Sequence, residues 1–419
     1  MGDRGDGSGD RGVRRGRLAV AALLLVAAAG PGLAQEISVN GLADLRLIRP
    51  SHQRSWLDGG LGKLGYAGGG DQAPDLRLAG LFLDTKMEFG SQFNLFTSLR
   101  HDPRQDETID ALEAYARYRT LSSGPWEGTL KLGAFFPPIS LENEGVGWTS
   151  PWTLSSSAIN TWVGEELRTI GGEATVEWQY ESGAIQLIGA LSGYSGPAGT
   201  LLAYRGWSVG DRATGLFDRN RQPDTAASRQ RHGVPMRNEP FVQIGNALSW
   251  YGGLAWRHED LGRIVLLHYD NEANPHEFKH DQFGWATRFT SLALETYVGD
   301  TVLLAQAMVG STQFDPSPTF NSVTRFQSAY LLAGRYFGTW TAAARIEAFA
   351  TQEDHNGRRL DLSERGHALT GSLSWKPLRW LRLTGEALRV DSYRGDRVNE
   401  GVAPRAVETQ YQLAARIFF

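Results

Sequence analysis

Hydrophobic and polar residues alternate along much of this chain, in runs of about ten residues that are separated by polar connections. In the final run, one face is mostly apolar and the other carries most of the polar side chains. The apolar face holds Ile417, Ala415, Leu413, Tyr411 and Thr409, and the opposite face holds Phe418, Arg416, Ala414, Gln412 and Gln410. A period of two with unlike faces predicts a β-strand between an apolar and a polar environment.

The same alternation recurs and predicts about sixteen strands. The clearest pair flanks Gly90-Ser91, a tight turn that joins the alternating runs 81–89 and 93–100 into a hairpin. The strands are expected to begin near Glu36, Leu78, Gln92, Ile109, Gly128, Arg168, Ala184, Phe241, Gly262, Gln282, Asp300, Arg325, Trp340, Glu364, Trp380 and Ala406.

The connections between these strands alternate between short and long. Short turns are expected at 90–91, 121–127, 181–183, 258–261, 298–299, 338–339 and 376–379. The intervening connections are mostly longer, above all 50–77, 137–167 and 193–240. Short turns on one side and long loops on the other are typical of transmembrane β-barrels. A soluble propeller would instead show a repeat of roughly forty to fifty residues, and the sequence contains none.

A membrane-spanning helix is not predicted, because no segment after Gln35 is continuously apolar for the roughly twenty residues that a helix needs. A chain that crosses a bilayer without helices must do so as a closed barrel, in which every strand edge is paired. The predicted fold class is therefore all-β: a transmembrane, antiparallel, up-and-down barrel of about sixteen strands.

The amino terminus predicts export. Four arginines between residues 11 and 17 precede the apolar run 18–29, and Gly32-Leu33-Ala34 places small residues at the positions that a signal peptidase recognises. Residues 1–34 are therefore expected to be a cleaved signal peptide, and 35–419 the barrel. The Arg14-Arg15 pair also fits a twin-arginine signal, although a barrel precursor must travel unfolded.

Composition removes several function classes. The 419 residues carry a net charge of −4 and no cysteine. A nearly balanced charge gives no reason to expect nucleic-acid binding, and the absence of cysteine excludes disulfides and thiolate chemistry. Any site that binds a charged ligand must therefore be formed by a local group of charged residues.

The signal peptide, the alternating strands and a carboxy-terminal strand that ends in Phe419 together resemble bacterial outer-membrane barrel proteins, in which such an end is an assembly signal for the barrel-assembly machinery. About sixteen strands with a long third outer loop, 137–167, are similar to trimeric porins whose third loop folds inward and narrows the pore. The resemblance implies a homotrimer in the outer membrane of a Gram-negative bacterium, in contact with membrane lipid and lipopolysaccharide.

The expected function is a porin, a water-filled channel for the passive diffusion of small hydrophilic solutes or ions, with no catalytic residue and no cofactor. Two other classes stay open: an outer-membrane barrel enzyme such as a hydrolase, and a plugged structural or adhesion barrel. Conductance separates a porin from a plugged barrel.

A narrower resemblance links the chain to phosphate-selective O/P-type porins. It rests on Gly133-Ala134-Phe135-Phe136-Pro137-Pro138 with Glu142, followed by Arg168-Thr169-Ile170-Gly171. The loop between them departs from a phosphate site, since residues 137–167 contain no Lys or Arg but four Glu. Phosphate selectivity carried by this loop does not follow.

Strand parity predicts which charges face the lumen. These pore-lining candidates are Asp44, Arg46, Arg100, Glu113, Arg117, Arg119, Lys131, Glu173, Glu177, Arg345, Glu347 and Arg416. Opposed acids and bases would create a transverse field that orients polar solutes. Alternatively, the charges pair with one another and hold the wall.

Two loops carry further candidates. The constriction-loop candidates are Glu142, Glu144, Trp148, Trp152 and Trp162, where the tryptophans fit either a slide for sugars or packing against the wall. The loop 193–240 is net basic, and it fits either a site that attracts anions and lipopolysaccharide phosphates or an ordinary solvated loop. Its charges are Arg205, Arg212, Arg219, Arg221, Arg229, Arg231 and Arg237, against Asp211, Asp218, Asp224 and Glu239.

One motif argues against a channel. The run His276-Glu277-Phe278-Lys279-His280 fits H-E-x-x-H, in which a helix presents two His to zinc and the Glu acts as a base. The motif requires a stable helix and a third ligand, whereas only about ten loop residues lie here between two strands. We therefore expect an ordinary loop and no metal, with a zinc site through His276, Glu277 and His280 as the alternative.

Overall fold

The computed structural model describes residues 36–66, 72–225, 235–355 and 361–419. The expected signal peptide, together with Arg229 and Arg231 of the basic loop, lies outside the described residues. No helix within the described ranges is both long and apolar enough to cross a membrane.

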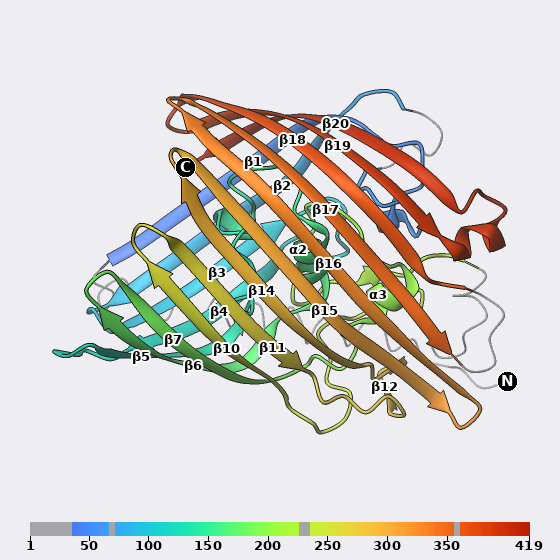
Figure 1. The fold of residues 1–419 in the computed structure, drawn as a ribbon, viewed down its shortest axis with the longest axis horizontal. Helices are drawn as coiled ribbons and strands as arrows, with labels where there is room; N and C mark the ends of the chain where they lie inside the picture. The colour runs from blue at the N-terminus through green and yellow to red at the C-terminus, as the bar shows by residue number, and fades with distance from the viewer. Residues whose placement is uncertain (1–35, 67–71, 226–234, 356–360) are drawn as a thin grey trace, which may run out of the picture.

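Sixteen antiparallel strands form one closed barrel, in which neighbours in sequence are neighbours in space (Figure 1). They are β1 (Glu36–Arg49), β2 (Asp75–Phe89), β3 (Phe93–His101), β4 (Asp110–Arg119), β5 (Trp126–Phe135), β6 (Thr169–Tyr180), β7 (Gly183–Gly193), β10 (Ser249–His258), β11 (Gly262–Asp270), β14 (Ala286–Val298), β15 (Thr301–Ser317), β16 (Phe320–Phe337), β17 (Trp340–His355), β18 (Glu364–Leu378), β19 (Leu381–Arg394) and β20 (Arg405–Phe418). The predicted fold class is confirmed.

Most strands begin within three residues of the predicted start, and three predictions were further off. The strand expected from Arg325 begins five residues earlier, at Phe320, because β16 continues into its hairpin with β15. The strand expected from Phe241 begins at Ser249, because Val242 and Ile244 are buried as loop residues rather than as strand residues. The strand expected from Gln282 begins at Ala286, since Gln282 belongs to a separate hairpin of β12 (Phe278–Lys279) and β13 (Gln282–Phe283).

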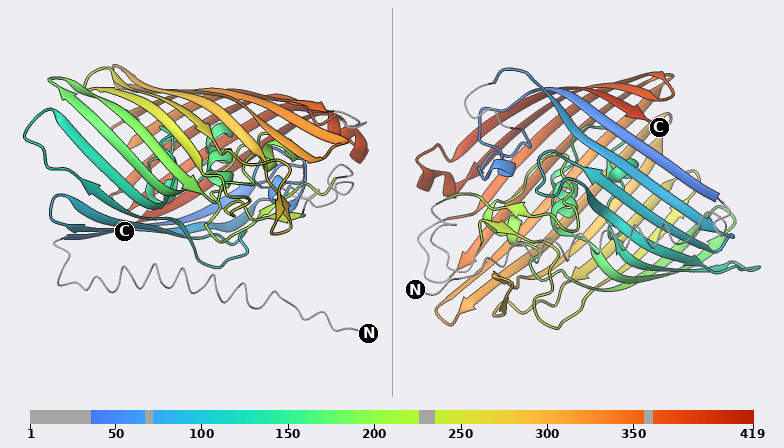
Figure 2. Two further views of the ribbon diagram at one scale, coloured as in Figure 1. Left: turned by 90° about the horizontal axis from the view of Figure 1, so that it is seen from below. Right: turned by 180° about the vertical axis from the view of Figure 1, so that it is seen from behind.

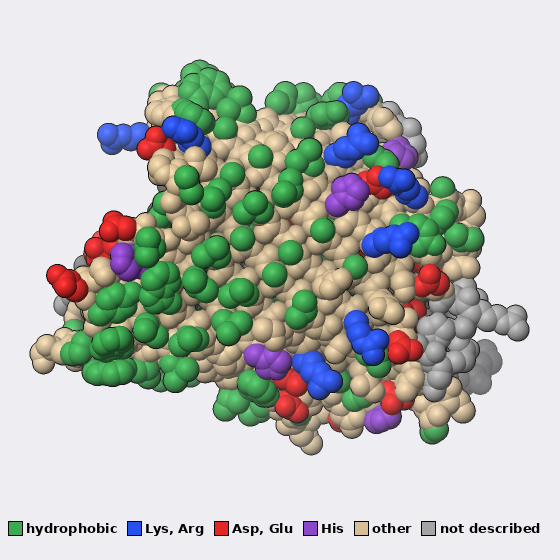
Figure 3. Space-filling model, in the orientation of Figure 1, with side chains coloured by type: hydrophobic (Ala, Val, Ile, Leu, Met, Phe, Trp, Pro, Cys, Tyr) green, Lys and Arg blue, Asp and Glu red, His purple; other side chains and the backbone are tan. Residues whose placement is uncertain are grey.

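The outer face of the barrel is apolar, whereas the inner face is polar. On β18, for example, Leu369 and Leu373 are about half exposed on the outside, while Thr370 and Ser372 between them are buried. Figure 3 shows a broad band of the wall without charged side chains. Tryptophans gather at the turn end, where Trp340 stacks on Trp375 with ring centroids 5.7 Å apart. Aromatic belts of this kind mark the edges of a hydrocarbon layer.

The barrel closes where β1 pairs with β20. Gly41 N–H donates to the Phe419 carbonyl at 2.7 Å, and Phe419 N–H donates to the Gly41 carbonyl at 3.2 Å. A Cβ atom on Gly41 would lie 2.2 Å from the Phe419 ring. A side chain at position 41 therefore competes with the aromatic ring for the same space.

We expect Gly41→Val to displace the Phe419 ring and to lower barrel stability by about 1–3 kcal/mol, the usual cost of overpacking. The temperature at which the folded gel band converts to the unfolded band measures this change. Gly189→Val on β7 is the matched control, because a Cβ there meets nothing within 4 Å. Equal transition temperatures for the two variants would contradict the steric account.

Three long loops fold back into the barrel (Figure 2). The described part of loop L1 (residues 50–66 and 72–74) carries η1 (Trp56–Asp58), and loop L3 (136–168) carries η2 (Val146–Trp148) and α2 (Ala158–Glu166). The described part of loop L4 (194–225 and 235–248) carries α3 (Thr200–Tyr204), β8 (Asn220–Arg221) and β9 (Arg237–Asn238). A short helix, η3 (Gly395–Glu400), lies between β19 and β20. Tertiary contacts inside the lumen therefore involve segments far apart in sequence.

Candidate functional site

Helix α2 lies within the lumen, and all nine of its residues are buried. Ser157 caps the helix by accepting a hydrogen bond from Asn160 N–H. Two carboxylates accept hydrogen bonds from two further N–H groups at this end: Glu142 from Ser157 N–H at 3.0 Å, and Glu347 from Ala158 N–H at 2.7 Å. Negative charge at a helix N-terminus is stabilised by the helix dipole.

Arg345 on β17 links both carboxylates to the barrel wall. Its Nη1 lies 2.6 Å from Glu142 and its Nε 3.0 Å from Glu347, and it also donates to the carbonyls of Ser155 and Ser156. All three ionic side chains are fully or almost fully buried. L3 is thus held against the wall by charge-assisted hydrogen bonds in a site without bulk water.

We expect Arg345→Met to destabilise the barrel by about 3–5 kcal/mol, because it leaves two carboxylates buried without their cation. Limited proteolysis of L3 and thermal unfolding measure the effect. Arg335→Met is the control, since the ion pair of Arg335 with Asp300 is exposed and contributes little. Equal resistance of both variants would show that this buried ion cluster does not anchor the loop.

The other end of α2 joins L3 to L4. Glu166 accepts hydrogen bonds from Trp162 Nε1 at 2.7 Å and from the N–H groups of Gly199 and Leu201, both at 2.9 Å. Burial raises the pKa of Glu166 to about 7, in spite of these three donors. Trp162 packs edge-on against Trp207, with ring centroids 6.1 Å apart.

The raised pKa of Glu166 predicts a pH dependence. The folded protein holds this proton more tightly than the unfolded chain, so the contribution of Glu166 to stability falls as the pH rises from its ordinary pKa of 4.5 to about 7. We expect the difference in melting temperature between pH 5 and pH 8 to shrink in Glu166→Gln. Asp300→Asn, at an exposed turn, should leave the difference unchanged; a pH dependence in Glu166→Gln equal to wild type would refute this role.

L1 completes the packing of the loop-side half of the lumen. Trp56 Nε1 donates to Glu165 at 2.9 Å, and Arg205 of L4 forms an ion pair with the same carboxylate at 2.6 Å. Lys63 forms an ion pair with Glu364 on β18, and burial lowers the pKa of Lys63 to about 7. We refer to L1, L3 and L4 together as the plug.

These contacts correct one prediction about 193–240. Its first part is not a solvated outer loop, because Arg205 and Arg212 are buried and form ion pairs with Glu165 and Asp218. Arg219 and Arg237 are more exposed, with 44% and 47% of their side chains accessible.

Several pore-lining candidates form ion pairs within this packed half. Asp44 lies 2.7 Å from Arg46 and 2.9 Å from Arg416, and Arg46 also lies 2.8 Å from Asp211 of L4. Arg100 forms an ion pair with Asp102. These charges connect the wall to the plug, which fits the interpretation that they hold the structure together.

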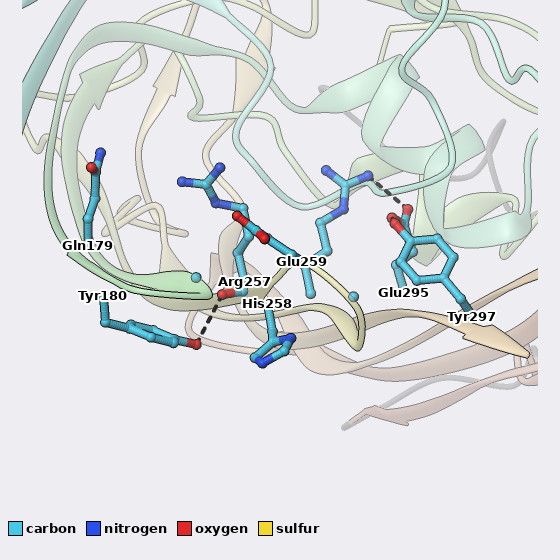
Figure 4. Close-up of a pocket in the computed structure, with 10 residues that line it drawn as sticks. Gln179, Tyr180, Arg257, His258, Glu259, Glu295 and Tyr297 are labelled. Carbon is cyan, nitrogen blue, oxygen red and sulfur yellow. Dashed lines mark hydrogen bonds and ion pairs between the residues drawn. The ribbon is translucent and has the colours of Figure 1, made fainter.

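The turn-side half of the lumen is hollow. A cavity of about 620 Å³ is lined by Arg117, Arg119, Glu127, Glu144, Glu177, Arg257 and Arg263, together with apolar wall residues. A second cavity of about 570 Å³ continues from it to the rim and shares Arg257 and Arg263 (Figure 4). In Figure 4 the Arg257 side chain rises toward the interior, while His258 points the other way. We call this region the vestibule.

Basic and acidic residues of the vestibule form ion pairs between different strands of the wall and between the wall and L3. Arg257 lies 3.0 Å from Glu177, and Arg119 lies 2.5 Å from Glu127. Glu144 extends from L3 and lies 2.5 Å from Arg263 on β11. The loop and the wall thus supply opposite charges to one water-accessible space.

The remaining candidates lie at the border between the vestibule and the plug. Glu113 accepts from Phe136 N–H at 3.1 Å, and Lys131 lies 3.5 Å from Glu173. Trp148 stacks on Phe136, with centroids 4.1 Å apart. Trp152 is buried and contacts Tyr336.

Comparison with known proteins supports the architecture. No family model and no curated protein matches the chain. Solved structures do match. The outer-membrane channel DcaP of Acinetobacter baumannii aligns with a TM-score of 0.56 and 11% identity, over 92% of this chain and 97% of that chain. The chain has the porin fold.

Two further structures share the porin fold. An anion-selective porin from Comamonas acidovorans aligns with a TM-score of 0.52 and 11% identity, over 92% of this chain and 99% of that chain. OmpT of Vibrio cholerae, in its trimer form, aligns with a TM-score of 0.51 and 9% identity, over 92% and 99%. At such low identity, the similarity shows the fold alone.

The H-E-x-x-H segment does not form a helix. Phe278 and Lys279 form β12, which pairs with β13, and His280 adopts a positive φ of 53° at the turn. The helical spacing that would bring His276 and His280 onto one face is therefore absent. Within the described part of the chain, no group of three His, Cys, Asp or Glu side chains is placed to hold a metal ion.

Sequence reasoning missed Arg257 and Arg263, which line the vestibule, and Glu386, which anchors L3. Glu386 accepts from Leu154 N–H at 2.6 Å and from the Ser155 hydroxyl at 2.8 Å. Strand parity contained the signal for all three, since each lies an even number of residues from a buried inward-facing neighbour on its own strand.

Proposed function

We propose that this protein is a porin, a channel of the Gram-negative outer membrane for the passive diffusion of small hydrophilic solutes or ions. The observation that supports it best is the vestibule: a charged cavity inside a closed barrel with an apolar outer wall, bounded by a loop folded into the lumen. No solute enters such a wall from the lipid side, so the lumen is the route across the membrane.

The charges of the vestibule set what enters. Arg117, Arg119, Arg257 and Arg263 face Glu127, Glu144 and Glu177 across the same space. The Arg117 side chain makes no hydrogen bond or ion pair with any described residue, so its charge is directed at the solution rather than at a carboxylate. We infer a modest preference for anions at this end.

The plug determines how strongly the lumen resists the passage of solutes and ions. The cavity between L1 and L4 on the loop side measures about 40 Å³, room for only a few water molecules, against about 620 Å³ in the vestibule. A plug packed this closely narrows the route of a solute through the loop-side half of the lumen. The same observation favours a second candidate function, a barrel that stays closed and serves as a structural or adhesion protein.

The assembly of the protein follows from the same proposal. We infer a homotrimer, in line with the trimer form of the Vibrio cholerae structure. We also propose that the strand ending at Phe419 is read by the barrel-assembly machinery.

Single-channel recording of residues 35–419 in planar bilayers under a salt gradient tests the porin proposal. We expect steady conductance with a reversal potential on the anion side. Arg117→Glu should move the reversal potential toward cation preference, because it reverses the charge that lacks an internal partner. Arg288→Gln, on the outer face of β14, should leave it unchanged. The absence of conductance from a folded, heat-modifiable barrel would favour the closed barrel instead.

A further inference from the structure

Glu144 of L3 lines two cavities of the lumen. One is the vestibule, and the other encloses about 430 Å³ beneath the L3 turn of residues 143–148. A space of this size is typical of small-molecule sites. Besides the turn, it is lined by wall residues of the first four strands: Ser38, Asn40, Asp84, Lys86, Phe96 and Glu113. Its charged lining is mainly acidic, in contrast to that of the vestibule. We call it the side cavity.

The strand register builds the floor of the side cavity from two rows of paired residues. Residues two positions apart on a strand share a face, so both rows point into the lumen. One row consists of Asn40, Asp84, Ser98 and Glu113, and the other of Ser38, Lys86 and Phe96. Asp84 and Glu113 therefore lie in the same row, with only Ser98 between them. The Phe96 ring, on the adjacent row, is partly exposed to the lumen although it is apolar.

The L3 turn places a second aromatic ring at this cavity. Gly147 and Trp148 adopt positive φ angles of 62° and 58°, a conformation that a bulky residue such as Trp rarely adopts. The turn is fixed to the wall, because Gly147 N–H donates to Asp84 at 3.1 Å. One side of the Trp148 ring is covered by Phe136, which stacks on it at 4.1 Å. The rest of the ring is partly exposed and borders the side cavity.

Two carboxylates of the side cavity lack a cationic partner in the described part of the chain. Lys86 forms an ion pair with Glu88, and Glu144 forms one with Arg263. Asp84 and Glu113 form no ion pair with any described residue, and both line the cavity. Each accepts a backbone hydrogen bond, Asp84 from Gly147 and Glu113 from Phe136. Their negative charges are therefore available to a cation from outside the chain.

An unpaired acceptor of the L3 turn independently indicates a donor in this place. Asn143 lines the side cavity and is only 6% exposed. Its Nδ2 donates to the Trp148 carbonyl and to the Ser156 hydroxyl, both at 2.8 Å and both within L3. Its Oδ1 lies on the other side of the amide and has no hydrogen-bond partner among the described residues. A buried amide oxygen without a donor is costly, so a ligand that supplies an N–H group would stabilise this turn.

We propose that the side cavity is a binding site for a small organic cation: a protonated primary amine on a flat, apolar body. The ammonium group lies over Ser98, between the carboxylates of Asp84 and Glu113, and the apolar body lies between the rings of Phe96 and Trp148. A primary ammonium group has three N–H donors, which match the two carboxylates and Asn143 Oδ1. Aromatic rings also attract a neighbouring cation. The site does not depend on whether the barrel conducts.

Calorimetric titration of the folded protein in detergent with phenethylammonium tests the charged part of the site. We expect Asp84→Asn/Glu113→Gln to weaken binding at least tenfold, although both amides still accept the backbone hydrogen bonds. Asp300→Asn removes a charge at an exposed turn and should leave binding unchanged. Equal affinity of the double variant and wild type overturns the proposal, as does equal binding of neutral 2-phenylethanol.

The match of three donors to three acceptors is tested with phenethyltrimethylammonium, which has the same charge but no N–H group. We expect wild type to bind it at least tenfold more weakly than phenethylammonium. Equal affinity for the two cations overturns the assignment of the ammonium group to Asp84, Glu113 and Asn143.

The aromatic walls are tested with Trp148→Gly, which removes the ring and suits the positive φ of this position. We expect the preference of the protein for phenethylammonium over ethylammonium to fall at least threefold. Phe96→Leu, on the regular strand β3, should lower the same preference and keeps the test decisive if the turn variant does not fold. An unchanged preference in the folded variants overturns the assignment of the apolar body to these rings.

Discussion

A sheet in hydrocarbon must close on itself, because an open edge would leave a row of N–H and C=O groups without partners. In this chain closure depends on β1 and β20, which lie at opposite ends of the described sequence and pair over eight residues of each strand. The other strand pairs of the barrel are hairpins or near neighbours in sequence. The non-local pair therefore decides whether the others form a barrel or a curled sheet with two open edges.

Closure of the barrel also encloses the polar inner face of the sheet. The inner face carries polar and charged residues, which are stable in water or beside partners but costly when covered without either. L1, L3 and L4 cover most of the loop-side half and bring partners with them: Glu142 to Arg345, Lys63 to Glu364, and Asp211 to Arg46. The turn-side half is left to water, and there the charges stay accessible. The polar inner face is therefore stabilised by ion pairs with the loops in one half of the lumen and by contact with water in the other.

The sequence predicted the wall well and the lumen poorly. Alternation is a local signal, so strand number, order and facing followed from runs such as 409–418, in which Leu413 and Tyr411 were placed correctly on the outer face. The loop interior depends on long-range contacts that leave no local period. Val265, Leu267 and Tyr269 on β11 face inward although they are apolar, because they belong to the same buried cluster as residues of L3 and L4. Parity places Arg263 on the same inward face, but it does not show that this residue lines a water-accessible cavity.

Closure by β1 and β20 also has a kinetic consequence. Leu42 and Phe418 are partners although 376 residues separate them. Contacts of such sequence separation form slowly, because much chain entropy is lost before they are made. Until β20 arrives, β1 and β19 present unpaired edges that attract any extended segment nearby. A catalyst of folding for this chain must therefore shield two edges at once, and an added peptide that copies β20 would compete for the edge of β1.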